Sequence, residues 1–323
     1  MTRSKSPLLL ASLLTLGVSI APAHAQQARS FVSGLGNDAN APNCTRTAPC
    51  RTFQVAHDNT LVGGEITVID VSSYGAVTIN RDISIVNNGA GEAGILVSGG
   101  NNGITINAGA TDIVTLRGIT IKGIGAGSGN GIVFNTGAVL IIQNCAISRM
   151  TGASPLGVGI TFLPNANATF AVSNTQVIGN QGGGILVFPS AGTGILVSAV
   201  LDGVGLYNNG PFGFLINGSN TAAAGRVTAT ISNSVAGNNG INGFAAASAA
   251  APAAIRLTNS VAAGNGVGLN ADTNSTITVG GSTLTSNIVN LTSGNGGAVD
   301  SWGNNYQVAN ITTNPFNGMI PLQ

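Results

Sequence analysis

Two aspartates and a tryptophan near the carboxyl-terminal end could take part in carbohydrate chemistry. Asp272 and Asp300 follow the glycines Gly268 and Gly297 at nearly the same offset, and Trp302 comes just after the second aspartate. If both glycines open equivalent repeats, the two carboxyl groups lie on neighbouring rungs of one face, where such a pair can hydrolyse a glycosidic bond. The indole would offer a platform for a sugar ring. The alternative is that these residues only cover the last repeat.

A second group of candidates is basic. Lys122 and Arg149 occur at nearly equal offsets in adjacent repeats, with Arg117 nearby, so they could contact an anionic ligand. No cluster of carboxylates accompanies them, and the alternative is a solvated edge. Together with Asp272 and Asp300, Lys122 and Arg149 are the catalytic candidates of the chain.

Signatures of other enzyme classes are missing. The chain has no phosphate-binding loop, no zinc-ligand spacing and no nucleophile elbow. Asp38 could bind calcium, but one carboxylate makes a poor site. We therefore expect no cofactor and assign no metal ligand, with calcium as the one alternative.

The amino-terminal segment is typical of a signal peptide. Arg3 and Lys5 precede an apolar stretch, and Ala23-His24-Ala25 forms a small-x-small cleavage site, so residues 1–25 are expected to be removed before Gln26. No later apolar run reaches the roughly 18 residues that suggest a transmembrane helix. We expect an exported protein, periplasmic or extracellular, with no transmembrane segment in the mature chain.

The charge balance excludes one class of partner. The chain has 11 basic and 10 acidic residues, which are 7% of the sequence, and 48 glycines. The basic footprint of a nucleic-acid-binding protein is absent, so no nucleic acid partner is expected.

The three cysteines have different expected roles. In an exported protein, Cys44 and Cys50 are expected to form a disulfide, the alternative being two free thiols. Cys145 lies among apolar residues and is expected to be a buried structural thiol. A catalytic thiol would need a histidine partner, and His57 is far away in sequence.

Internal repeats are the strongest structural signal. Glycines that open short apolar runs recur every 25 to 30 residues: Gly103, Gly131, Gly159, Gly184, Gly213, Gly243, Gly268 and Gly297. The first and third residues after each glycine are apolar, with only the third residue of the last repeat breaking the pattern, which predicts strands with one buried face. A repeat this short cannot bury its own apolar residues and must stack on its copies.

Two Asn- and Gly-rich turns separate the strands of each repeat. The first contains Asn144, Asn174, Asn233 and Asn259, at positions where a bend needs a left-handed backbone. We expect these asparagines to form a ladder of amide hydrogen bonds from coil to coil. The second turn, for example Gly179-Asn180, leads back to the next opening glycine.

These observations predict an all-β fold, a single-stranded right-handed parallel β-helix with a short amino-terminal capping helix. Residues 26–64 would hold the entry strand, the disulfide loop and a helix over 51–62, with Phe53, Ala56 and Leu61 covering the open end. Residues 65–323 would form the β-helix with a carboxyl-terminal cap. Leucine-rich repeats and left-handed hexapeptide solenoids do not fit the spacing.

The outward positions of the first strand in each repeat are nearly uncharged. They include a group of apolar residues that could form a ligand or partner surface, to which Trp302 is added as a candidate: Leu163, Leu186, Phe188 and Leu215. Such a surface leaves a homo-oligomer open, and the alternative is that a loop covers it.

The entry segment adds a family resemblance. Phe31 to Gly34 as a first strand, Pro49 leading into Thr52-Phe53 and Gly63 to Val68 as the first coil strand resemble the entry of right-handed β-helix repeat proteins of the pectin-lyase-like superfamily. The resemblance runs roughly from Phe31 to Asn310. It implies enzymes that degrade acidic polysaccharides on the outside of one sheet, lyases with calcium beside an Arg or Lys base and hydrolases with clustered aspartates.

The leading hypothesis is a non-catalytic exported rod that binds carbohydrate or a cell-envelope component, because charges are sparse and no catalytic constellation is visible. The first alternative is a polysaccharide lyase or glycoside hydrolase, which rests on the fold resemblance. The second alternative is an adhesin-like secreted passenger.

Overall fold

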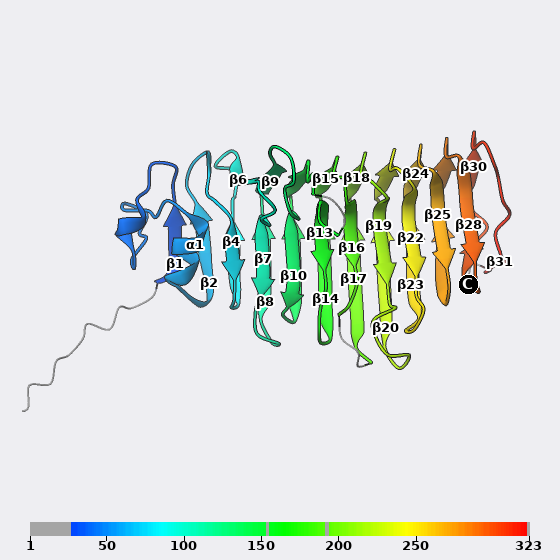
Figure 1. The fold of residues 1–323 in the computed structure, drawn as a ribbon, viewed down its shortest axis with the longest axis horizontal. Helices are drawn as coiled ribbons and strands as arrows, with labels where there is room; N and C mark the ends of the chain where they lie inside the picture. The colour runs from blue at the N-terminus through cyan, green and yellow to red at the C-terminus, as the bar shows by residue number, and fades with distance from the viewer. Residues whose placement is uncertain (1–26, 153–154, 191–193, 322–323) are drawn as a thin grey trace, which may run out of the picture.

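The protein is a rod of stacked coils in which every sheet is parallel. The computed structural model describes residues 27–152, 155–190 and 194–321. Successive coils lie side by side from β1 at one end to β30 and β31 at the other (Figure 1). The expected signal peptide, residues 1–25, lies outside the described residues. Within the described residues no helix is both long and apolar enough to cross a membrane.

The strands form three sheets, which we call A, B and C. From β4 to β30 each coil contributes one strand to sheet C, then one to sheet A and then one to sheet B. In the described residues sheet C has nine strands, β4 (Val77–Ile79), β7 (Ile104–Asn107), β10 (Ile132–Thr136), β13 (Val158–Phe162), β16 (Gly183–Val187), β19 (Phe212–Asn217), β22 (Asn242–Ala247), β25 (Val267–Asp272) and β28 (Val289–Gly294).

Sheet A has twelve described strands, among them the longest of the rod: β1 (Gln27–Val32), β2 (Thr60–Val68), β5 (Ile83–Val86), β8 (Ile113–Arg117), β11 (Val139–Gln143), β14 (Ala168–Ser173), β17 (Leu196–Asp202), β20 (Arg226–Ser232), β23 (Ala253–Thr258), β26 (Ser275–Gly280), β29 (Ala298–Ser301) and β31 (Gly318–Met319).

Sheet B has ten described strands, most of them only three residues long: β3 (Ser72–Ser73), β6 (Ala93–Val97), β9 (Ile119–Gly123), β12 (Ala146–Ser148), β15 (Gln176–Ile178), β18 (Gly205–Tyr207), β21 (Val235–Gly237), β24 (Val261–Ala263), β27 (Thr283–Thr285) and β30 (Tyr306–Val308). The β-helix predicted from the repeats is confirmed.

The predicted core columns are correct for the first seven repeat glycines. The residue after each glycine pairs with its equivalent in the next coil and is buried: Ile104, Ile132, Ile160, Ile185, Phe214, Phe244 and Leu269. The glycine itself is needed for close approach. A Cβ at Gly131 would lie 2.4 Å from the carbonyl oxygen of Gly159 in the next coil.

The eighth repeat was aligned wrongly. Gly297 does not open a strand of sheet C, because β28 fills that place and its Leu291 pairs with Leu269. Gly297 lies instead in the bend before β29, close to the carbonyl of Ala271. The last coil is shorter than the others, so the glycine spacing no longer reports the register there.

The asparagine ladder exists, but not in the predicted turn. Asn144, Asn174, Asn233 and Asn259 do adopt the predicted left-handed backbone, with φ of 53°, 47°, 51° and 47°, yet they are exposed. Hydroxyl groups bridge the coils there instead, as where the backbone N–H of Ser234 donates to Oγ of Ser260. The turn contributes a bend, and its ladder is made of Ser and Thr.

The buried ladder lies in the second turn, between sheets B and C. Six asparagines take part, and the side-chain amide of each donates to the side-chain oxygen of the next at 2.9–3.1 Å: Asn180, Asn209, Asn239, Asn265, Asn287 and Asn310. Each amide also donates to a backbone carbonyl, as Asn239 does to Leu206. The coils from Asn180 to Asn310 are therefore tied to one another through a satisfied, largely buried polar chain.

The amino-terminal cap is shorter than predicted. Helix α1 (Phe53–Asp58) begins at the N-cap Thr52, and Phe53 and Ala56 cover the core as expected. Leu61 does not belong to this helix. It lies on β2 and is 43% exposed, because the chain leaves the helix at Asn59 to pair with β1.

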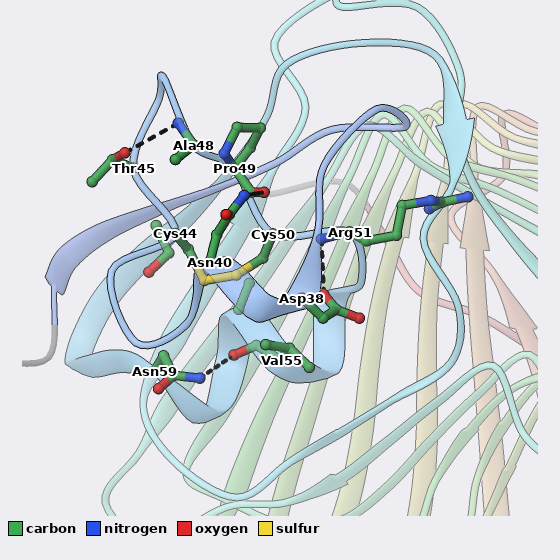
Figure 2. Close-up of a disulfide and its surroundings, with 12 residues drawn as sticks. Asp38, Asn40, Cys44, Thr45, Ala48, Pro49, Cys50, Arg51, Val55 and Asn59 are labelled. Carbon is green, nitrogen blue, oxygen red and sulfur yellow. Dashed lines mark hydrogen bonds between the residues drawn. A yellow bond between two sulfur atoms is a disulfide. The ribbon is translucent and has the colours of Figure 1, made fainter.

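The predicted disulfide between Cys44 and Cys50 forms in the loop after β1 and the short helix η1 (Asp38–Asn40) (Figure 2). Asp38 accepts hydrogen bonds from the backbone N–H groups of Arg51 and Thr52 beside it. The carboxylate considered for calcium therefore fixes the start of α1.

Cys145 is a buried structural thiol, as predicted. Burial raises its pKa to about 11, so the group stays protonated at neutral pH. Cys145 lies at the position where later coils have a hydroxyl group, as in Thr175 and Ser234.

His57 is buried in the cap in its neutral form. Its Nδ1 is 2.9 Å from the Asp58 carboxylate, and its Nε2 accepts the backbone N–H of Asn80. Burial lowers its pKa despite the bond to Asp58. The folded protein therefore resists protonation of this side chain.

We expect the cap to lose stability as pH falls through the ordinary histidine pKa of about 6.5, because the unfolded chain then binds a proton that the folded chain excludes. Urea unfolding followed at pH values from about 7.5 down to 5 should show this decline. In His57→Gln the decline over this range should be smaller, and an unchanged slope would contradict the assignment.

The ladder makes a second prediction. Asn239→Ala should lower the free energy of unfolding by at least about 2 kcal/mol, because it leaves buried donors on Asn209 without acceptors. The matched control is Asn238→Gly at the preceding position. Asn238 is exposed with φ of 55°, so this substitution should change the free energy of unfolding by less than about 1 kcal/mol. Equal urea midpoints for the two variants would show that the ladder contributes little.

Candidate functional site

The predicted carboxylate pair does not form. Asp272 ends β25 on sheet C and pairs with Gly294, whereas Asp300 lies on β29 of sheet A opposite Thr278. The misaligned last repeat caused this error, since it placed the two aspartates in one column. The two carboxylates therefore do not share the column on which the predicted hydrolase site depended.

Asp272 has a structural role in its bend. Its Oδ1 accepts hydrogen bonds from the backbone N–H of Thr273 and the side-chain amide of Asn295. Thr273 has a left-handed φ of 32°, so these bonds hold an unfavourable turn. Asp300 is partly exposed on the outer face of sheet A, with its carboxylate against Gly318.

The basic candidates lie on another sheet. Lys122 on β9 is opposite Ser148, and Arg149 follows directly, so the two are neighbours on the outside of sheet B. Both are exposed. Among the described residues neither has an acidic group within ion-pair distance. The four catalytic candidates therefore occupy three different sheets.

The apolar group on sheet C is contiguous, as predicted. Leu186 pairs with Leu215, and Leu163 and Phe188 follow the paired residues of β13 and β16. All four are partly buried. Thr161 stands among them with its hydroxyl buried and without a hydrogen-bond partner in the described residues.

A concave surface lies over sheet A. It is a groove of about 940 Å³ that crosses β11, β14, β17, β20 and β23. Its floor includes a column of hydroxyl groups from paired positions, Thr169, Ser198 and Thr228. Residues 223–225 and Pro252, from the connections between sheets C and A, line the groove as well.

Two arginines enter this groove. Arg226 starts β20 opposite Leu196, and Arg256 lies on β23 opposite Thr230, so both side chains leave the same face of sheet A. Both are exposed, and in the described part of the chain neither has an acidic partner within 4 Å. Among the described residues that line the groove, none is a carboxylate or a histidine.

This lining is suited to an anionic, hydroxyl-rich ligand. Guanidinium groups bind carboxylates with paired hydrogen bonds, and the hydroxyl column can exchange hydrogen bonds with sugar hydroxyls. Among the described residues no group of three or more His, Cys, Asp or Glu gathers.

The groove was not predicted from the sequence. The outward positions considered there belong to the strand after each repeat glycine, and these strands form sheet C. Arg226 and Arg256 belong to the following strand, where alternation around buried Val227, Ile255 and Leu257 already marks them as outward. Their neighbourhood depends on register between coils, which one repeat alone does not reveal.

Comparisons with known proteins agree with the fold. A pectate lyase structure has a TM-score of 0.63 at 17% identity, covering 90% of this chain and 78% of its own. An alginate lyase from Paenibacillus gives 0.58 at 12% identity, covering 90% and 99%. A rhamnogalacturonan lyase gives 0.53 at 13%, covering 90% and 87%. No curated protein matches the sequence significantly.

The family described as "Right handed beta helix region" matches residues 102–284, which is more than half of the chain. This segment holds the coils from β7 to β26, including the groove and the first four asparagines of the ladder, Asn180 to Asn265. The chain belongs to the right-handed β-helix family.

Proposed function

We propose that the protein interacts with acidic polysaccharide, which it holds in the groove over sheet A. The observation that carries this proposal is the pair Arg226 and Arg256, two cations without acidic partners in the described residues, at a groove lined with hydroxyl groups. A groove of about 940 Å³ is within the range of ligand sites. Because the rest of the surface carries few charges, these arginines dominate the local field.

Two forms of this function are open, and the comparisons support the lyase better than the non-catalytic rod. The similar structures are lyases of pectate, alginate and rhamnogalacturonan, although at this identity the likeness is one of fold. A lyase removes the proton beside a sugar carboxylate and expels the glycosidic oxygen. Arg226 and Arg256 can stabilise the negative charge that develops on the carboxylate.

The groove lining accounts for binding and charge stabilisation but supplies no ordinary base. None of the described lining residues is a carboxylate, histidine or lysine. A lyase here would need an arginine to accept the proton, as the family resemblance implies. Non-catalytic binding needs only the residues that line the groove.

Export remains part of the proposal. The disulfide between Cys44 and Cys50 supports it, since disulfides persist in oxidising compartments. An extracellular or periplasmic protein would also meet polysaccharide directly.

The test is incubation of the purified protein with polygalacturonate, alginate and a neutral glucan, with and without calcium. Binding is measured by calorimetry, and cleavage by reducing ends and by the ultraviolet absorbance of an unsaturated product. We expect the protein to bind the acidic polymers, and we expect added salt to weaken this binding. Unsaturated product would establish the lyase, and binding without cleavage the non-catalytic form.

We expect Arg226→Gln with Arg256→Gln to weaken binding of the acidic polymers roughly tenfold or more, because each arginine makes a charge-assisted contact. The matched control is Arg149→Gln, an exposed arginine on sheet B, which should bind normally. Equal affinity of the double variant, or equal binding of the neutral glucan, would overturn the proposal.

A further inference from the structure

Trp302 lies against Gly280 on the outer side of sheet A. It follows β29, and a Cβ built on Gly280 would lie 2.0 Å from its ring atom Cε3. The equivalent residues in the preceding coils all carry side chains: Gln143, Ser173, Asp202, Ser232 and Thr258. An edge of the indole therefore occupies the space that a side chain at Gly280 would fill.

The glycine at this position is explained by space and not by backbone conformation. Gly281 has a left-handed φ of 59° and forms the bend, but Gly280 does not adopt positive φ. Any other residue there could keep the strand but would displace the indole. Gly280 is thus matched to Trp302.

A role in closing the end of the rod does not account for the exposure of this ring. At the opposite end, Phe53 and Tyr74 close the core and are fully buried. Trp302 is partly exposed, and it follows the outward residues of β29, Ala298 and Asp300, at the next outward position. The ring is therefore available from the outer face.

The register brings the groove arginines and the indole into one line. Arg256 pairs with Thr278, which is two residues before Gly280, so Arg256 and Gly280 are about 8 Å apart at their Cα atoms. Arg226 lies about 14 Å from Arg256 by the same reckoning, in the same general direction. A polymer that enters the groove can reach the ring.

We propose that Trp302 is a stacking platform for a sugar ring of the bound polysaccharide, whose chain runs diagonally across sheet A from Arg226 past Arg256. This inference rests on the proposed function and adds a subsite to it. The apolar C–H face of a sugar ring packs on the indole, as flat apolar surfaces do on aromatic rings. Asp300, one coil beyond Thr278, disfavours a carboxylate on its side and can accept a sugar hydroxyl.

The test uses the fact that Trp302 is the only tryptophan of the chain. Oligogalacturonates of increasing length are added to the purified protein, and tryptophan fluorescence is followed beside calorimetry. We expect binding by both methods, with the fluorescence change and its protection from an added quencher growing with oligosaccharide length, because only longer chains span both arginines and the ring.

Trp302→Leu should weaken binding of the long oligosaccharides roughly threefold to tenfold and leave the short ones unchanged. Trp302→Phe, which keeps a ring, should restore most of the affinity. Thermal unfolding of both variants checks that the last coil still forms. If Trp302→Leu fails to fold, the fluorescence of the unaltered protein decides alone.

Calorimetric binding without any change in fluorescence would overturn the stacking subsite and leave the proposed function standing. No binding by calorimetry would reject the proposed function, and the subsite with it.

Discussion

The parallel hydrogen bonding between successive coils is the constraint on which the rest of this structure depends. Ile104 pairs with Ile132, and Ile132 pairs with Ile160. This pairing places all remaining strand residues of these coils next to their equivalents in the neighbouring coil. Inward positions then form continuous apolar columns, and polar residues that must be buried can bond only up or down the rod. The asparagine ladder from Asn180 to Asn310 satisfies that requirement. Stability in such a solenoid is a sum of neighbour-to-neighbour contacts, so one ladder position affects two interfaces.

The same constraint determines where a site can be built. Outward side chains stand in columns about 4.8 Å apart, which gives a flat surface unless a connection between strands rises above it. Residues 218–225 form such a connection before β20, longer than the two-residue bend at 273–274 before β26. The groove lies beside the longer connection, and its lining does not extend to β26, which follows the shorter one. Variation in the bends, and not in the strands, therefore shapes the candidate site.

Much of the fold could be predicted from the sequence, because the same pattern of glycine and alternating apolar residues recurs in many repeats. The opening glycines and alternating apolar residues identify sheet C without any long-range information. The ladder could not be assigned in the same way, since asparagine occurs in both turns, and burial in one of them depends on how the coils stack. Asp300 was misplaced for a related reason, because a single shortened coil shifts the register after Leu269. Arg226 and Arg256 enter the same groove only through the register between coils, and they are 30 residues apart in the chain, so no local pattern links them.

The spacing of the arginines bears on which ligand could use them. At roughly 14 Å they are separated by more than the screening length of about 8 Å at physiological salt, so a small anion meets one cation at a time. One exposed charge contact of this kind contributes little affinity. A polymer with a carboxylate on successive sugars differs, because its first contact holds the next carboxylate near the second arginine at high effective concentration. The geometry of sheet A therefore favours a repeating polyanion over a free acid, whether or not the bound chain is cleaved.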